Sequence, residues 1–150
     1  MFEDPRTRAV WFGKALPREW LEATATAVKL HRVPTRYGRI SMTMKAVAGG
    51  AGAAGGTESV EAHGSDLSAP RGAPYAVHAS LMLPEGFAPP GGLKLRVRVP
   101  LHAGKIVGVA VGGEAWKEFN VAEETVNFAA STLTPGMVAR LKAVVVTFKH

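Results

Sequence analysis

The chain has 150 residues, of which 47% are hydrophobic and 20% charged, with 17 Gly, 10 Pro and no Cys. This is the length of one ordinary domain, which can fold without disulfides or a structural metal, and the lack of cysteine excludes a thiolate nucleophile and cysteine-based zinc or iron–sulfur sites. The 18 Lys and Arg outnumber the 12 Asp and Glu, so the net charge is +6 and nucleic acid or an acidic polymer is the first partner to consider.

The sequence shows no membrane or secretion segment. No apolar run reaches the roughly 18 residues of a membrane span, and the first residues lack the basic and apolar regions of a secretion signal. We therefore expect no membrane partner. The chain either works where it is made or is a piece of a longer secreted protein, and the compartment stays open.

The first third of the chain predicts two strands separated by a helical turn. A short apolar run within 6–15 indicates a strand. Pro17, followed by acidic residues, predicts one helical turn over 17–22. The segment 24–33 is rich in β-branched residues, and we expect this strand to end before Pro34.

Two further strands flank a segment of unusual composition. Apolar and polar residues alternate over 39–47 and again over 75–83, which is typical of amphipathic strands. Between them, residues 48–73 are rich in Gly and Ala and have no periodicity. We interpret 48–73 as a flexible insertion between neighbouring strands, the alternative being a boundary between two half-domains.

The second half continues as short strands separated by turns. Residues 93–99 alternate Leu and Val with Lys94, Arg96 and Arg98, which predicts a half-buried strand with a charged outer face. The pair Gly112 and Gly113 indicates a hairpin. Further strands are predicted over 105–111, 114–119, 123–130 and 139–148, with a turn at 134–136 before the last.

Together these elements predict a fold of the all-β class. About eight short strands, turns rich in Gly and Pro, and no long amphipathic helix favour an antiparallel β-sandwich that forms a single domain over 1–150, with the Gly/Ala-rich loop as an insertion. A barrel with a similar number of strands is the alternative.

No pattern of catalytic, metal-binding or cofactor-binding residues emerges from the sequence. The five histidines have no metal-ligand spacing, the serines lack a nucleophile elbow, and the Gly-rich stretch lacks the Lys and Ser or Thr of a phosphate-binding loop. The few carboxylates offer no recognisable acid and base pair for sugar hydrolysis. We therefore expect no catalytic residues, no metal and no cofactor.

The aromatic residues are the better candidates for contact with a partner. Trp11 lies in an apolar strand and Trp116 follows the Gly pair, so we expect both to pack in the core. Trp20 on the helical turn and Tyr37 between two arginines have polar surroundings. Together with their neighbours, they make up the candidate interface or sugar-contact set, which is Trp20, Leu21, Arg36 and Tyr37.

Several segments resemble a known family. Residues 93–100 read LKLRVRVP, 106–116 read IVGVAVGGEAW and 124–128 read ETVNF. Upstream, 16–21 read LPREWL and 34–41 read PTRYGRIS. These runs are similar to the C-terminal β-sandwich domains appended to six-hairpin, (α/α)6-barrel glycosidase-like proteins. The chain departs from that pattern at Gly112, where the family pattern has Asn, and in the Gly/Ala insertion.

The resemblance implies a non-catalytic accessory domain that packs on, or assists, a catalytic (α/α)6 barrel. The catalytic acids of such proteins belong to the barrel, so none is expected in this chain. The alternatives are a stand-alone carbohydrate-binding module and a basic β-domain that binds nucleic acid or an acidic polymer. The spread of the basic residues along the chain argues against nucleic acid.

Overall fold

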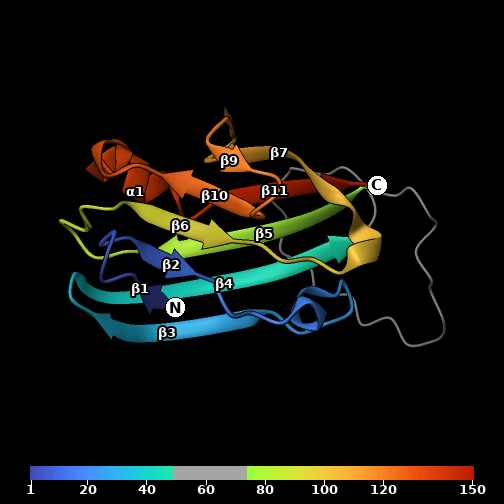
Figure 1. Cartoon of the computed structure of the whole chain (residues 1–150), viewed down its shortest axis with the longest axis horizontal. Coiled ribbons are helices and arrows are strands. Elements are labelled where there is room, and N and C mark those ends of the chain that lie inside the picture. The colour runs from blue at the N-terminus through green and yellow to red at the C-terminus, as the bar shows by residue number, and fades with distance from the viewer. Residues whose placement is uncertain (49–73) are drawn as a thin grey trace.

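Two β-sheets pack face to face in the computed structural model, which describes residues 1–48 and 74–150 (Figure 1). The first has five strands, in the spatial order β1 (Phe2–Glu3), β2 (Val10–Phe12), β6 (Leu93–Arg96), β10 (Thr125–Phe128) and β9 (Phe119–Asn120). The second has six, in the order β3 (Val28–Thr35), β4 (Gly38–Ala48), β5 (Tyr75–Met82), β11 (Val144–Lys149), β7 (Lys105–Val111) and β8 (Glu114–Trp116).

The predicted all-β sandwich is thus confirmed. The described residues form eleven strands rather than about eight, partly because the segment 114–119 divides between β8 and β9, which belong to different sheets. The two-residue strand β1 adds another.

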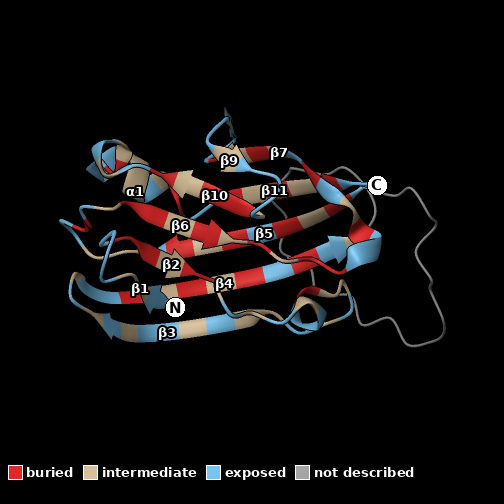
Figure 2. Ribbon diagram, in the orientation of Figure 1, coloured by how far each residue is buried: buried red, intermediate tan, exposed pale blue. Residues whose placement is uncertain are grey.

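The core lies between the sheets and is built by alternation along the central strands (Figure 2). On β6 and the residue after it, Leu93, Leu95 and Val97 are fully buried, whereas Lys94 and Arg96 alternate with them and remain partly exposed. A period of two places alternate side chains on opposite faces of a sheet. The predicted strand with an apolar inner face and a basic outer face is therefore confirmed.

Strand pairing is antiparallel with one exception. β2 runs parallel to β6, with Val10 opposite Leu93 and Phe12 opposite Leu95. These two strands come from distant parts of the chain, so no short hairpin forces them to be antiparallel.

The strands on either side of the Gly/Ala-rich segment are neighbours, as predicted. β4 and β5 pair along their length, and Ala48 lies opposite Tyr75. Apart from Ala48, the predicted insertion at 48–73 lies outside the described residues.

Two local predictions were wrong. β3 continues through Pro34 to Thr35, because β3 is an edge strand, where a residue without an N–H group is tolerated. The segment 139–148 is not strand throughout, because its beginning belongs to the helix α1 (Pro135–Arg140). The hydroxyl of Thr134 accepts a hydrogen bond from the Met137 N–H, 3.3 Å away, so this Thr-Pro pair caps a helix.

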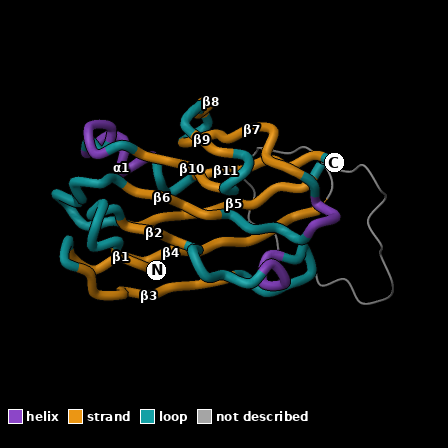
Figure 3. The backbone as a smooth tube through the Cα atoms, in the orientation of Figure 1, coloured by secondary structure: helices purple, strands orange, loops and turns teal. Residues whose placement is uncertain are grey.

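Short helices lie at both ends of the sandwich (Figure 3). The predicted helical turn is confirmed as the 3₁₀ helix η1 (Arg18–Leu21), which lies at the same end as η2 (Leu101–Ala103). The third 3₁₀ helix, η3 (Ala130–Thr132), precedes α1. The predicted hairpin between β7 and β8 is also confirmed, since Gly112 and Gly113 have φ values of 58° and 85°.

Candidate functional site

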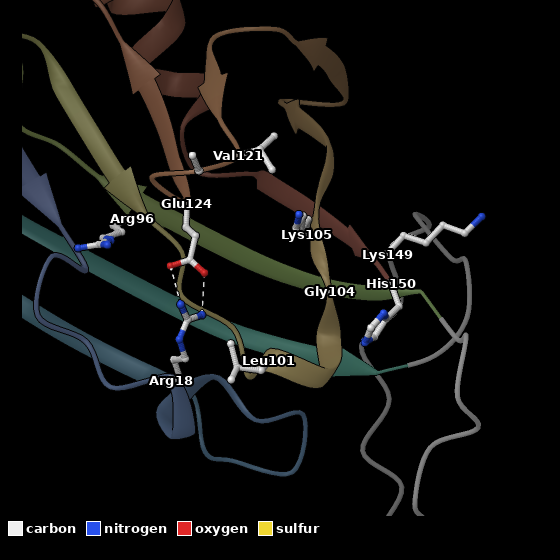
Figure 4. A pocket seen from close by; sticks show the side chains of 10 residues that line it. Arg18, Arg96, Leu101, Gly104, Lys105, Val121, Glu124, Lys149 and His150 are labelled. Carbon is white, nitrogen blue, oxygen red and sulfur yellow. Dashed lines mark hydrogen bonds and ion pairs between the residues drawn. The ribbon is translucent and has the colours of Figure 1, made fainter.

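A cleft of about 590 Å³ opens at the end of the sandwich where η1 and η2 lie (Figure 4). Its walls come from both sheets and from the connections between their strands. It is lined by Arg18, Arg96, Leu101, Gly104, Lys105, Val121, Ala122, Glu124, Lys149 and His150.

An ion pair between residues 106 positions apart forms one wall of this cleft. Arg18 donates to both carboxylate oxygens of Glu124, at 2.6 and 3.1 Å, and to the carbonyl oxygen of Val99 at 2.7 Å. Arg98 approaches the same carboxylate, with its Nε 3.5 Å from Oε2. With guanidinium groups on two sides, Glu124 is suited to holding η1 in place.

The remaining charged side chains of the cleft are basic. Arg96, Lys105 and Lys149 line it, and none of them forms an ion pair with another described residue. The alternation of apolar and basic residues over 93–99 predicts that Arg96 lies on the outer face of its strand. Nothing in the sequence predicts that Arg18, Lys105 and Lys149 line one cleft, because only the tertiary packing brings them together.

Trp20 and Leu21, two members of the predicted contact set, differ in burial. The Trp20 side chain is 56% exposed and lies beside a second hollow of about 350 Å³ between η1 and the beginning of β3. This confirms that Trp20 is not a core residue. Leu21 is fully buried, so its place in the contact set was wrong: it is the apolar anchor that fixes η1 to the core.

Arg36 and Tyr37 lie at the other end of β3. β3 has eight residues, and seven steps of about 3.3 Å place this end roughly 23 Å from the Trp20 hollow. Arg36 is exposed and pairs with Glu3 at 3.4 Å, and Tyr37 packs edge-on against Phe87 with ring centroids 6.0 Å apart. The four predicted contact residues therefore do not form one site.

The two tryptophans predicted to be core differ from each other. Trp116 is partly buried and stacks on Phe128, with ring centroids 5.0 Å apart, as a core-packing residue does. Trp11 instead lies half-buried on the outer face of the five-stranded sheet, because Val10 and Phe12 take the inward positions of the three-residue strand β2. The prediction for Trp11 was wrong for this reason.

The outer face of the six-stranded sheet has a different character. Its central part carries short or uncharged side chains on three adjacent strands. They are Ala76, His78 and Ser80 on β5, Val145 and Thr147 on β11, and Gly108 and Ala110 on β7, and together we call them the short-side-chain face.

Neither a metal cluster nor a membrane-spanning helix is found in the described part of the chain. No three His, Asp or Glu side chains there are grouped so that they could hold a metal ion. None of the helices in residues 1–48 and 74–150 is long and apolar enough to cross a bilayer.

Comparisons with protein-family models, curated proteins and solved structures found no match to this chain.

Proposed function

We propose that the chain is a non-catalytic accessory β-sandwich of a carbohydrate-active protein, which packs on a catalytic (α/α)6 barrel through its short-side-chain face. The proposal extends the sequence resemblance, and the composition of this face is the observation that carries it. A sheet face that meets only water usually bears polar side chains, as the outer face of β6 does with Lys94 and Arg96. In the central part of β5, β11 and β7 the outward positions carry Ala, Gly, Ser, Thr, Val and one His, and the longer side chains Met82, Lys149 and Lys105 lie at the strand ends.

The register makes this face continuous. His78 lies opposite Val145, which lies opposite Ala110, and in the next row Ala76, Thr147 and Gly108 align in the same way. Short side chains let another surface approach the backbone of the sheet closely, with little side-chain entropy to lose. This arrangement suits a partner whose surface is broad enough to pack against all three strands.

The hollows support a non-catalytic role. Hydrolysis of a glycosidic bond needs two carboxyl groups that face each other across the substrate. The first cleft is lined by one carboxylate, Glu124, and the second hollow by one, Glu19. Neither arrangement supplies an acid and base pair.

The test uses Gly108, where an added side chain meets open space. A Cβ atom built there finds no heavy atom within 4 Å, so Gly108→Glu should leave the isolated domain folded. We expect the wild-type chain to copurify with an (α/α)6-barrel protein encoded in the same or the adjoining reading frame. Gly108→Glu should weaken this association about tenfold or more, because it places a charge in the buried interface.

Gly136→Glu is the matched control, because Gly136 also faces open space but lies on α1. It should bind like the wild type. The absence of a barrel in the genetic neighbourhood, or equal binding by the two variants, would refute the docking proposal.

A stand-alone carbohydrate-binding module is the second candidate, favoured by Trp20. Its exposed ring borders a hollow that also contains Glu19, Thr26 and Lys29. An aromatic ring flanked by hydrogen-bonding side chains suits a sugar, which has an apolar face and hydroxyl groups at its rim.

A further inference from the structure

The outer face of the five-stranded sheet carries a group of cations with aromatic rings beneath them. Lys94, Arg96 and Arg98 follow one another on the outward side of β6 and its continuation, and Trp11 lies beside them on β2. With Lys14, these residues make up what we call the basic face. Glu124 neutralises part of the charge of Arg18 and Arg98, whereas Lys14, Lys94 and Arg96 form no ion pair with other described residues.

The same face holds every buried side-chain polar atom that lacks a hydrogen-bond partner among the described residues. They are Trp11 Nε1, Arg96 Nε, Thr125 Oγ1, Asn127 Oδ1 and Arg98 Nε, which forms no hydrogen bond within the described part of the chain but lies 3.5 Å from Glu124 Oε2 in an ion pair. Leaving a buried polar group without a partner is costly, and such groups in native proteins usually find a water, an ion or a ligand. These atoms lie on adjacent strands of one face, but other protein atoms cover each of them, so a ligand on this face meets the charged ends of the side chains instead.

The lysines of this face are held over aromatic rings. Lys94 Nζ lies 4.8 Å from the centroid of the Trp11 ring, and Lys14 Nζ lies 5.2 Å from the same ring and 3.8 Å from that of Phe2. Cation–π contacts keep these ammonium groups in place. Both ammonium groups lie over the Trp11 ring, so a nucleobase would have to displace a lysine before it could stack there.

We propose that the basic face binds an acidic polysaccharide, a linear chain that carries uronic acid carboxylates, along β6. Outward residues on a strand repeat every 6.6–7 Å or so, which sets Lys94, Arg96 and Arg98 in a line for a ligand with repeated charges. The ammonium groups pair with the carboxylates from their positions over the aromatic rings. The sugar hydroxyls then accept hydrogen bonds from the remaining N–H groups of the same cations.

Charge complementarity and hydrogen bonding together favour this ligand class. Carboxylates match the guanidinium and ammonium groups, and sugar hydroxyls accept from the N–H groups that no carboxylate occupies. The cleft at the far end of β6 extends the positive surface, with Lys105 and Lys149 beyond Arg96. This proposal uses a different face from the docking surface, so it does not depend on the proposed function.

The experiment measures the binding of the 150-residue chain to polygalacturonate and to its fully methyl-esterified form, with oligothymidylate as the nucleic-acid probe. We expect binding to polygalacturonate that weakens with added salt, and at least about tenfold weaker binding to the ester, which has lost its carboxylates. The double variant Lys94→Gln/Arg96→Gln should lose about tenfold or more in affinity for polygalacturonate.

The matched control is Lys45→Gln/Lys142→Gln, which removes the same charge from exposed positions that lie outside the basic face and line neither hollow. It should bind within about twofold of the wild type, because the basic face stays intact, whereas attraction by net charge alone would weaken equally in the two double variants. The variant Lys94→Arg/Arg96→Lys keeps both charges and should retain binding, which guards against a folding defect in the Gln variant. Gly108→Glu should not alter this affinity.

Three outcomes would overturn the proposal. They are no binding to polygalacturonate, equal losses in the two Gln double variants, and tighter binding to oligothymidylate than to polygalacturonate.

Discussion

Tyr75 shows how one buried polar group joins two elements. Its phenol O–H donates to the backbone carbonyl of Leu21, so β5 holds the end of η1 through this bond while Leu21 fills the core beside it. Burial, with a smaller effect from the negative charge of Glu22, raises the pKa of Tyr75 to about 12. The position of the exposed Trp20, next to Leu21, therefore depends on a tyrosine more than 50 residues away.

The raised pKa of Tyr75 predicts a particular loss of stability at high pH. In the unfolded chain this phenol ionises near pH 10, whereas in the folded chain it stays neutral up to about pH 12. Its contribution to the free energy of unfolding is therefore complete below pH 10 and is lost as pH rises toward 12. Tyr75→Phe should cost about 1 kcal/mol at pH 8, and the difference from the wild type should shrink by pH 11.5.

Urea unfolding at several pH values measures this difference. Tyr37→Phe is the control, because the Tyr37 hydroxyl forms no hydrogen bond to another described residue. A difference between wild type and Tyr75→Phe that stays constant from pH 8 to 11.5 would contradict the assignment.

At the scale of elements, the pairing of β6 with β10 depends on a glycine. Gly92 directly precedes β6 and has φ = 75°, and a Cβ atom there would collide with the carbonyl oxygen of Phe128 at the end of β10. Two effects therefore exclude a side chain: the left-handed backbone and the close approach of the neighbouring strand.

Gly86 separates these two effects, because it has φ = 73° but open space around its Cβ position. Gly86→Ala should cost about 1–2 kcal/mol, the conformational penalty alone. Gly92→Ala should cost clearly more, because it also forces the strands apart. Thermal or urea unfolding of both variants measures the difference, and equal losses would show that the approach of the two strands does not constrain Gly92.

At the scale of the whole molecule, the sandwich presents two outer faces of different chemistry. The six-stranded sheet carries the short-side-chain face, and the five-stranded sheet carries the basic face. A domain built in this way can pack on one partner and still offer a charged surface to another. The Trp20 hollow lies at a third place, beside the edge strand β3.

The position of Trp20 provides a test of the stand-alone module. If the domain binds neutral sugars there, Trp20→Ala should abolish the retardation of the chain in gels that contain a neutral polysaccharide, while Trp20→Phe should retain part of it. Trp20→Ala should leave the melting temperature nearly unchanged, because more than half of the side chain is exposed. A chain that is not retarded by any neutral polysaccharide in a broad panel would refute this candidate.

The sequence by itself determined the strands and the faces of their side chains wherever alternation was regular. Residues 39–47, 75–83 and 93–99 follow the predicted pattern of burial, because a period of two assigns each side chain to one face regardless of the neighbouring strand. The helical turn at η1 and the Gly-Gly hairpin were also predicted, since their signals are local. The helix α1 was missed because its Thr-Pro-Gly start is equally typical of a turn.

Only the tertiary structure decided which strands are neighbours and therefore which side chains meet. Arg18 and Glu124 form one wall of the cleft although 106 positions separate them, and β8 and β9 join different sheets although two residues connect them. The short-side-chain face exists because β5, β11 and β7 lie side by side. Alternation fixes the side of a sheet on which a residue lies, but the pairing of distant strands depends on how the whole chain closes its core.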